Sequence, residues 1–415
     1  MMKGIVLFSL FLINLAVCAG ELNDNKVENN VIRIYQDADL TNHLESSEAI
    51  QKGIEVAFDE VENRVAGYKV EFKYLNHRGN VVRSKKNYES FLADPEALAI
   101  FSGIHSPPLI KNRTFINENQ ALTLVPWAAG GPITRYPSTE NWVFRLSIDD
   151  TQAGPVIVDF ALEEKQCRAP HLLLEATPWG DSNLESMLKA LSVQGISIPG
   201  VTRFGWNIRE QGARFLLRKI AASNYDCVIL VANAIEGAVI TQSMIDLPEE
   251  QRLPIISHWG ITGGNFHEKI TVEKREEIDL SFIQTCFAFT DKNRSDFSGN
   301  VFDRLKKISG DSIKEAKDLK SAVGFIHAYD LTKLLIQAIN QAGLTGNRHA
   351  DRNAIRLALE NLKQPVQGLV KLYEKPFVEF DLDNNVNGHE ALHSDHYCMA
   401  RYGSQDEIDI IERSQ

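Results

Sequence analysis

The chain has 415 residues, of which 44% are apolar and 24% charged, and its formal net charge is −11. This length exceeds what one ordinary hydrophobic core accommodates, so we expect two lobes. The composition is that of a globular protein. The negative charge argues against a nucleic-acid partner, because nucleic acids are normally bound by a basic surface.

The N-terminus has the pattern of a secretory signal peptide over residues 1–19. Lys3 precedes an apolar run that ends at Val17, and cleavage is expected after Ala19. The run is too short for a membrane span. We therefore predict a periplasmic or otherwise extracytoplasmic protein. Lipid attachment at Cys18 is the less favoured alternative, because Val17 is a poor residue to precede a lipidated cysteine.

Four cysteines follow the predicted signal peptide, and three of them lie in apolar runs. We expect these side chains to be small buried hydrophobic groups. An oxidising compartment would also permit one disulfide, whose pair the sequence cannot choose. No CxxC motif or paired-histidine spacing is present, so no metal site and no cofactor are predicted. The cysteines are Cys167, Cys227, Cys286 and Cys398.

Short apolar runs alternate with amphipathic segments, which predicts an α/β fold with parallel strands joined by helices. The pattern restarts after Gly154 and predicts a second α/β set. The expected strands are 31–35, 69–75, 98–101, 121–125 and a short one at 142–145, then 171–174, one near 201, 227–232, 254–257 and 280–289. The expected helices are 48–62, 87–92, 109–116, 155–163, 182–193, 209–222 and 238–245. A third part is expected to hold helices at 297–308, 320–342 and 352–362 and late strands at 378–381 and 396–402.

Two loops follow neighbouring strands of the first set, at the edge where open α/β sheets bind ligands. The loop over residues 105–108 is rich in proline, and the loop over residues 126–131 carries a tryptophan and two glycines. We expect these two loops to lie side by side at a ligand site.

The order of several short motifs resembles that of a known family. The motifs are the crossover Trp142-Val-Phe-Arg-Leu with Asp149-Asp150 and Gln152-Ala-Gly154, the Trp179-Gly180-Asp181 segment, the late Tyr329-Asp330 pair, and Val378-Glu-Phe-Asp381 with a following glycine. Together they resemble the type I periplasmic solute-binding proteins of the leucine/isoleucine/valine-binding class, which serve ABC transporters. The likeness covers residues 31–402.

The resemblance implies two Rossmann-like lobes with parallel-sheet cores, joined by three hinge crossovers. Lobe 1 would comprise residues 31–149 plus 293–386, and lobe 2 residues 150–292 plus 387–413. The implied function is a receptor that traps a small molecule and delivers it to an ABC permease. A sensor subunit of a membrane signalling receptor is the alternative. No G-x-S-x-G, HExxH or phosphate-binding glycine loop is present, so we do not predict an enzyme.

At the positions where the family's amino-acid binders hold their ligand, this chain has different residues. The first loop keeps one serine but has two prolines that cannot donate a backbone N–H. The usual threonine of the second loop is replaced by alanine, the Tyr-Gly cap of lobe 2 becomes Trp179-Gly180, and the acidic position is replaced by His258 or Trp259, with Glu175 or Glu236 as substitutes. The predicted ligand-binding residues are His105, Ser106, Trp127, Ala128, Ala129, Trp179, Asn233, Glu236, His258 and Trp259.

Three of the five tryptophans fall on these loops, namely Trp127, Trp179 and Trp259. Large aromatic residues also cap loops over a core, but three at one edge favour a flat aromatic or cationic ligand. The two histidines of the set could donate to a carboxylate or could be surface loop residues. For Arg145 and Asp149 we predict an ion pair at the hinge in preference to ligand contact.

Overall fold

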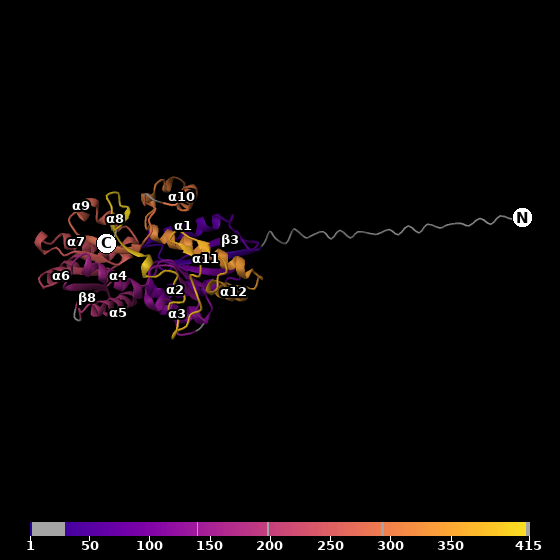
Figure 1. Ribbon diagram of the computed structural model, residues 1–415, viewed down its shortest axis with the longest axis horizontal. Helices are drawn as coiled ribbons and strands as arrows, with labels where there is room; N and C mark the ends of the chain where they lie inside the picture. The colour runs from indigo at the N-terminus through magenta and orange to yellow at the C-terminus, as the bar shows by residue number, and fades with distance from the viewer. Residues whose placement is uncertain (2–29, 139, 197–198, 292–293, 412–415) are drawn as a thin grey trace.

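The computed structural model describes Met1 and residues 30–138, 140–196, 199–291 and 294–411. Apart from Met1, the predicted signal peptide and Cys18 lie outside these residues. Figure 1 shows two lobes side by side along the longest axis of the molecule.

The first lobe, called lobe 1, is built on a six-stranded sheet with the order β2-β3-β1-β4-β5-β6. All neighbouring strands are parallel except β2 and β3. Strand β4 is buried along its whole length because helices cover both faces of the sheet. The strands are β1 (Val31–Ala38), β2 (Arg64–Val65), β3 (Tyr68–Asn76), β4 (Ala97–Ser102), β5 (Thr123–Val125) and β6 (Val143–Arg145).

Lobe 2 is built on a seven-stranded sheet with the order β15-β14-β11-β10-β9-β7-β8. Five strands run parallel, and the late strands β14 and β15 join antiparallel at one edge. The two sheets confirm the predicted α/β fold with two parallel-sheet lobes. The strands are β7 (Pro170–Glu175), β8 (Gly200–Phe204), β9 (Cys227–Val231), β10 (Ile255–Ser257), β11 (Leu280–Thr285), β14 (Tyr397–Tyr402) and β15 (Ile408–Ile410).

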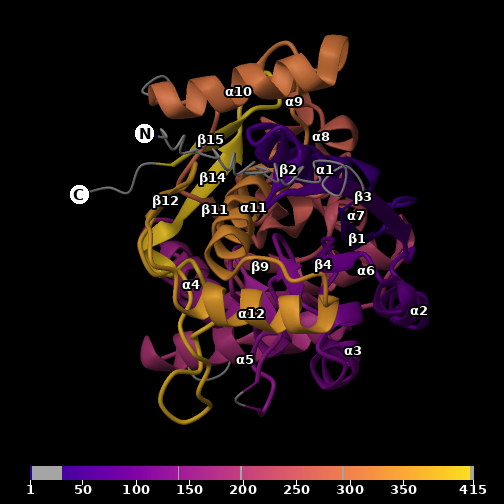
Figure 2. The same cartoon turned by 90° about the vertical axis from the view of Figure 1, so that its right-hand side faces the viewer.

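Helices from both ends of the chain cover the sheet of lobe 1. Helix α11 packs on α1 and α12, and Figure 2 shows α11 between α10 and α12. Its 21 residues end at Gly343, whose φ of 72° suits glycine at a helix C-terminus. These helices are α1 (Leu44–Asp59), α2 (Val81–Ala93), α3 (Ser106–Glu118), α10 (Asp296–Ser309), α11 (Ala322–Ala342) and α12 (Arg348–Glu360).

Lobe 2 is covered by α4, which packs on β9, β10, β11 and β14, and by five further helices. These helices are α4 (Asp150–Glu163), α5 (Pro178–Val193), α6 (Glu210–Ala221), α7 (Ala234–Ile245), α8 (Phe266–Lys269) and α9 (Val272–Arg275). Among the described residues, no helix is both long enough and apolar enough to cross a membrane.

Some predicted element boundaries are wrong. Helices α3, α5 and α7 begin earlier than expected, so Ser106, Trp179 and Glu236 lie in first helical turns and not in loops. The prolines that suggested a loop stand at the start of α3 and α5, where the missing N–H costs nothing because that group has no partner within the helix. Residues 378–381 form no strand, and only an isolated bridge joins Asp381 to Asn385.

A buried ionic network lies where the chain first passes from one lobe to the other. The Arg145 guanidinium, fully buried, donates to Asp149 at 2.8 Å and to Glu390 at 2.6 and 2.7 Å. Burial alone would raise the pKa of the Asp149 carboxyl, but Arg145 and Arg135 hold it below its usual value. The predicted hinge ion pair is present, and the sequence missed its second carboxylate.

The expectation that the cysteines are free, buried thiols is wrong. They form two disulfides, Cys167–Cys227 and Cys286–Cys398, which close loops of 60 and 112 residues. Cys286 is exposed, contrary to the expectation from its apolar run. The second bridge joins β14 to the residue after β11, beside the second and third connections between the lobes. Two bridges indicate an oxidising compartment.

We expect a double Cys286→Ser, Cys398→Ser variant to lose about 2–5 kcal/mol of unfolding free energy, because the disulfide restricts the unfolded chain. Urea denaturation of the oxidised proteins measures the loss. The matched control is the double Cys167→Ser, Cys227→Ser variant, which opens the shorter loop. An unchanged free energy in the first variant would contradict the assigned bridge.

Candidate functional site

The carboxyl ends of five parallel strands from the two sheets face one another across the interlobe boundary. Residues that follow β4, β5, β7, β9 and β10 enclose a central space with an accessible volume of about 10 Å³, the room of a single water molecule. We call it the central space. Its lining residues are Ile104, His105, Ser106, Pro107, Trp127, Ala129, Trp179, Asn233, Trp259 and Gly260.

Seven of the ten predicted ligand residues line the central space, and three do not. Ala128 turns its carbonyl to Arg145 of the hinge, at 3.3 Å. Glu236 accepts the backbone N–H of Asn207 within lobe 2, at 2.9 Å. His258 lies behind the lining residues and is fully buried.

Two tryptophans from opposite lobes meet across the central space. The ring centroids of Trp127 in lobe 1 and Trp259 in lobe 2 are 5.6 Å apart, with the planes inclined by 46°. Trp259 also lies 5.4 Å from the ring of His327 in α11. A glycine permits this approach, since a Cβ on Gly324 would stand 2.8 Å from the Trp127 ring. Both indoles are buried, and each adds apolar surface to the closed boundary.

The third tryptophan is held by a carboxylate that the sequence did not single out. Trp179 donates its Nε1–H to Asp150 at 3.3 Å, and the same carboxylate lies 3.0 Å from Nε2 of His258. The rings of Trp179 and His258 meet edge to face at 5.1 Å. Asp150 starts α4 directly after the hinge residue Asp149. This adjacency in the sequence was the one indication that Asp150 lies near the ligand site.

Glu175 supports the lobe 2 side of the central space. Its carboxylate accepts the backbone N–H and side-chain amide of Asn233, at 2.9 and 3.0 Å, and the indole N–H of Trp206 at 2.7 Å. Burial raises the pKa of Glu175 from its usual 4.5 to about 7, in spite of these donors. The group therefore changes charge near neutral pH.

Direct hydrogen bonds join the lobes around the central space. The N–H of Gly131 in lobe 1 donates to the Ser182 hydroxyl of lobe 2 at 2.9 Å. Within lobe 1, the Ser106 hydroxyl oxygen accepts the Gly130 N–H at 3.1 Å and keeps its own proton as a donor. Between the lobes, the Ala129 carbonyl accepts the Asp150 N–H at 2.9 Å. The arrangement is a closed one, in which polar groups of the loops satisfy one another.

Comparisons with known proteins agree on one family. The family model of periplasmic binding proteins matches residues 43–242. A type 1 periplasmic binding protein from Bordetella pertussis superposes with a TM-score of 0.75 at 17% identity, over 92% of this chain and 100% of that one. Residues 43–242 thus match this family, and the fold is that of a type I periplasmic binding protein. Among curated proteins, no sequence matches it.

Two further solved structures share this type I fold. A leucine-binding protein from Thermotoga maritima has a TM-score of 0.71 at 17% identity, over 92% of this chain and 98% of that one. A solute-binding protein from R. palustris, solved with 4-hydroxybenzoate, has a TM-score of 0.72 at 15% identity, over 93% and 96%. At these identities the likeness concerns the fold.

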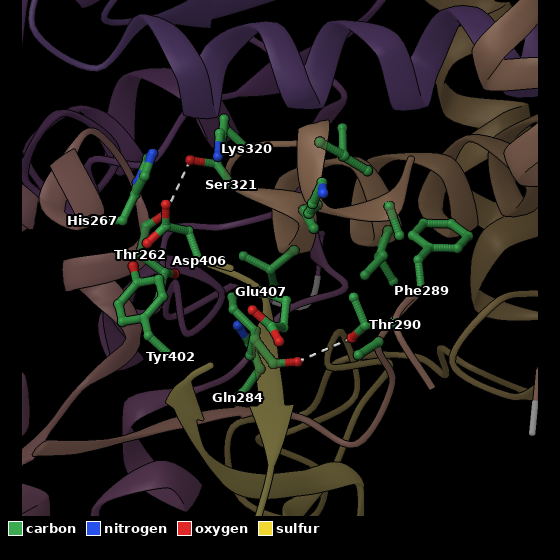
Figure 3. A pocket seen from close by; sticks show the side chains of 18 of the residues that line it. Thr262, His267, Gln284, Phe289, Thr290, Lys320, Ser321, Tyr402, Asp406 and Glu407 are labelled. Carbon is green, nitrogen blue, oxygen red and sulfur yellow. Dashed lines mark hydrogen bonds between the residues drawn. The ribbon is translucent and has the colours of Figure 1, made fainter. Parts of the chain in front are cut away.

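Other hollows of this protein lie away from the predicted ligand residues. Open grooves of about 620 and 590 Å³ flank the central space. Figure 3 shows a pocket of about 50 Å³ at the start of α11, where Ser321 donates to the Thr262 carbonyl. Asp406 and Glu407 face into this pocket region with Lys320 nearby. None of the ten predicted residues lines these hollows, so the central space remains the candidate site.

We expect Glu175 to make a contribution to stability that grows as the pH falls from about 7 towards 4.5. A carboxyl whose pKa is raised by folding binds its proton more tightly in the folded state, so its contribution grows through this window. The difference corresponds to about 3 kcal/mol. Urea denaturation at both pH values should show that the wild type gains stability relative to Glu175→Gln as the pH falls. Other buried groups, such as Asp37 with its pKa raised to about 7 and His327 with its pKa lowered to about 3, act equally in both proteins and cancel in this difference.

Proposed function

We propose that this protein is an extracytoplasmic solute receptor that traps a small molecule between its lobes and delivers it to an ABC importer. The observation that carries the proposal is the meeting of Trp127 and Trp259 from opposite lobes beyond the carboxyl ends of the strands. Two disulfides and the family match support a location outside the cytoplasm.

The lining of the central space favours a planar ligand that is neutral or cationic. It holds three tryptophans, and none of its described residues is lysine or arginine. The Asp150 carboxylate stands behind Trp179. For the carboxylate of an α-amino acid the lining offers the Ser106 hydroxyl proton but no lysine or arginine. Indole faces, in contrast, bind flat rings by stacking and cations by cation–π attraction.

Among the structurally similar proteins, one is named as a leucine-binding protein and another is solved with 4-hydroxybenzoate. The shared fold therefore does not choose the ligand, and the lining residues must. The space of about 10 Å³ cannot hold any of these molecules. A ligand must enter while the lobes are apart and then take the place of the direct contact between Trp127 and Trp259.

We expect calorimetric titration to find binding of an aromatic amine or a quaternary ammonium compound and weak or no binding of leucine. Trp127→Ala should weaken the binding by about tenfold or somewhat less, because one stacking contact contributes about 0.5–1.5 kcal/mol. Trp127→Phe, which keeps a ring, should lose less. Thermal melting of each variant establishes that it is folded. Tight leucine binding by the wild type would contradict the proposed ligand class.

We expect the ligand found in this way to shift an open–closed equilibrium, because both lobes contact it only when closed. Small-angle X-ray scattering should then give a smaller radius of gyration in its presence. Gly131→Pro, which removes the N–H that donates to Ser182, should enlarge the radius of the ligand-free protein. A radius that neither ligand nor variant changes would argue against a hinged trap.

A further inference from the structure

Three metal-ligating side chains meet at the edge of the interlobe boundary. Asp39 follows β1, His43 precedes α1, and His105 follows β4. One ligand atom from each lies within 4.8 Å of the others, and all three residues are buried, with exposures of 1%, 5% and 6%. We propose that this triad binds a divalent transition-metal ion of the zinc class, at a site that shares only His105 with the lining of the central space.

His105 has no other use for its nitrogens in this structure. Both ring nitrogens are buried without a hydrogen-bond partner, and Nε2 lies 3.4 Å from the Asp39 carboxylate. A buried polar atom left unsatisfied costs free energy, so such atoms normally have a partner. A metal ion between the carboxylate and the imidazole would satisfy both groups.

His43 is set in the tautomer that a metal ligand needs. Its Nδ1 lies 3.3 Å from the carbonyl oxygen of Gly263, which can only accept, so Nδ1 carries the proton. The lone pair of Nε2 is then free for an ion. Histidine ligands usually donate their other ring N–H to a carbonyl or carboxylate in this way.

Asp39 is held in a fixed orientation by its own loop. Its Oδ1 accepts the backbone N–H groups of Thr41 and Asn42, both at 3.0 Å, and its Oδ2 accepts the Asn42 side-chain amide at 3.1 Å. This fixed orientation places Oδ2 of Asp39 at 3.4 Å from Nε2 of His105.

The neighbouring His77 is not a fourth ligand in this geometry. Its Nδ1 accepts the Gly79 N–H at 2.9 Å, so Nε2 carries the proton and has no free lone pair. The triad thus offers two nitrogens and one oxygen, a set that suits Zn²⁺ with a fourth position for water or another ligand.

Lobe 2 closes over the triad. Gly263, which accepts the His43 proton, lies in lobe 2, and the Trp206 ring of the same lobe lies 5.4 Å from His105. The three ligands themselves belong to lobe 1. An ion held by lobe 1 would therefore gain its outer contacts only when the lobes are closed, which links metal binding to closure.

Within the described residues, two other groups of possible metal ligands also lie within 4.8 Å of one another. Neither is as good a candidate for a metal site. Cys167 and Cys227, near Asp226, are already joined in a disulfide. His267 with Glu45 and Glu268 forms a more exposed group, in which Glu268 is exposed and Glu45 half-buried. His267 thus serves as the control for adventitious binding.

The test is titration of the untagged, chelator-treated protein with Zn²⁺ by calorimetry, and with Co²⁺ by visible absorption. We expect one site, with d–d bands of a low-coordinate Co²⁺ centre. His43→Ala, His105→Ala and Asp39→Asn should each weaken Zn²⁺ binding at least tenfold, whereas His267→Ala should not. Asp39→Asn keeps the size and one of the two acceptor oxygens of the side chain, so it removes the charge without emptying the space.

Failure of Zn²⁺ to bind the wild type overturns the proposal, as does equal loss in His267→Ala and the triad variants. Thermal melting with and without Zn²⁺ gives an independent measurement, since an ion that binds only the folded state raises the melting temperature. That rise should vanish in Asp39→Asn while the metal-free melting temperature remains measurable. The test uses the metal alone, so its outcome is independent of the proposed solute.

Discussion

The buried Arg145 is the interaction on which the arrangement of hinge and site depends. A guanidinium without access to water must be paired and hydrogen-bonded, because an unpaired buried charge is strongly destabilising. Its partners are Asp149 at the first connection between the lobes and Glu390 at the third. It also donates to the carbonyl of Gly130 at 2.9 Å. One side chain thereby fixes two hinge connections and the loop that carries Trp127.

The same network extends to the opposite wall of the central space. Asp149 accepts a hydrogen bond from Arg145 at the hinge. The next residue, Asp150, accepts the indole N–H of Trp179 and lies beside the His258 ring. A rotation of the lobes about this hinge must therefore move Trp127 and Trp179 relative to each other. Because the buried pairs lie on the hinge itself, they can persist while the surfaces farther from it separate. This geometry couples ligand-induced closure to a small number of fixed contacts.

The sequence predicted what local patterns determine and missed what distant segments bring together. Buried strands such as β4 and β9 were clear from their apolar runs, and Arg145 and Asp149 stand four residues apart in one motif. Glu390 lies 245 residues from Arg145, so no local pattern could assign it. The disulfides were missed for the same reason, since apolar runs suit free and bonded cysteines alike. Asp39 and His43 also stand four residues apart, but a pair of one aspartate and one histidine is not a CxxC or paired-histidine spacing, so no metal site was predicted there.

The two proposed sites share His105, which both lines the central space and belongs to the metal triad. Without an ion, the Asp150 carboxylate accepts the indole N–H of Trp179 and the Asp39 carboxylate lies beside His105, so a cationic or neutral ring is favoured. A bound divalent cation would reverse the charge on the His105 side, because two positive charges outweigh the single negative charge of Asp39. An anionic group of a ligand could then be accepted at that end while its ring stacks on the indoles. The metal content of the protein would thus decide which charge of aromatic ligand the same tryptophans select.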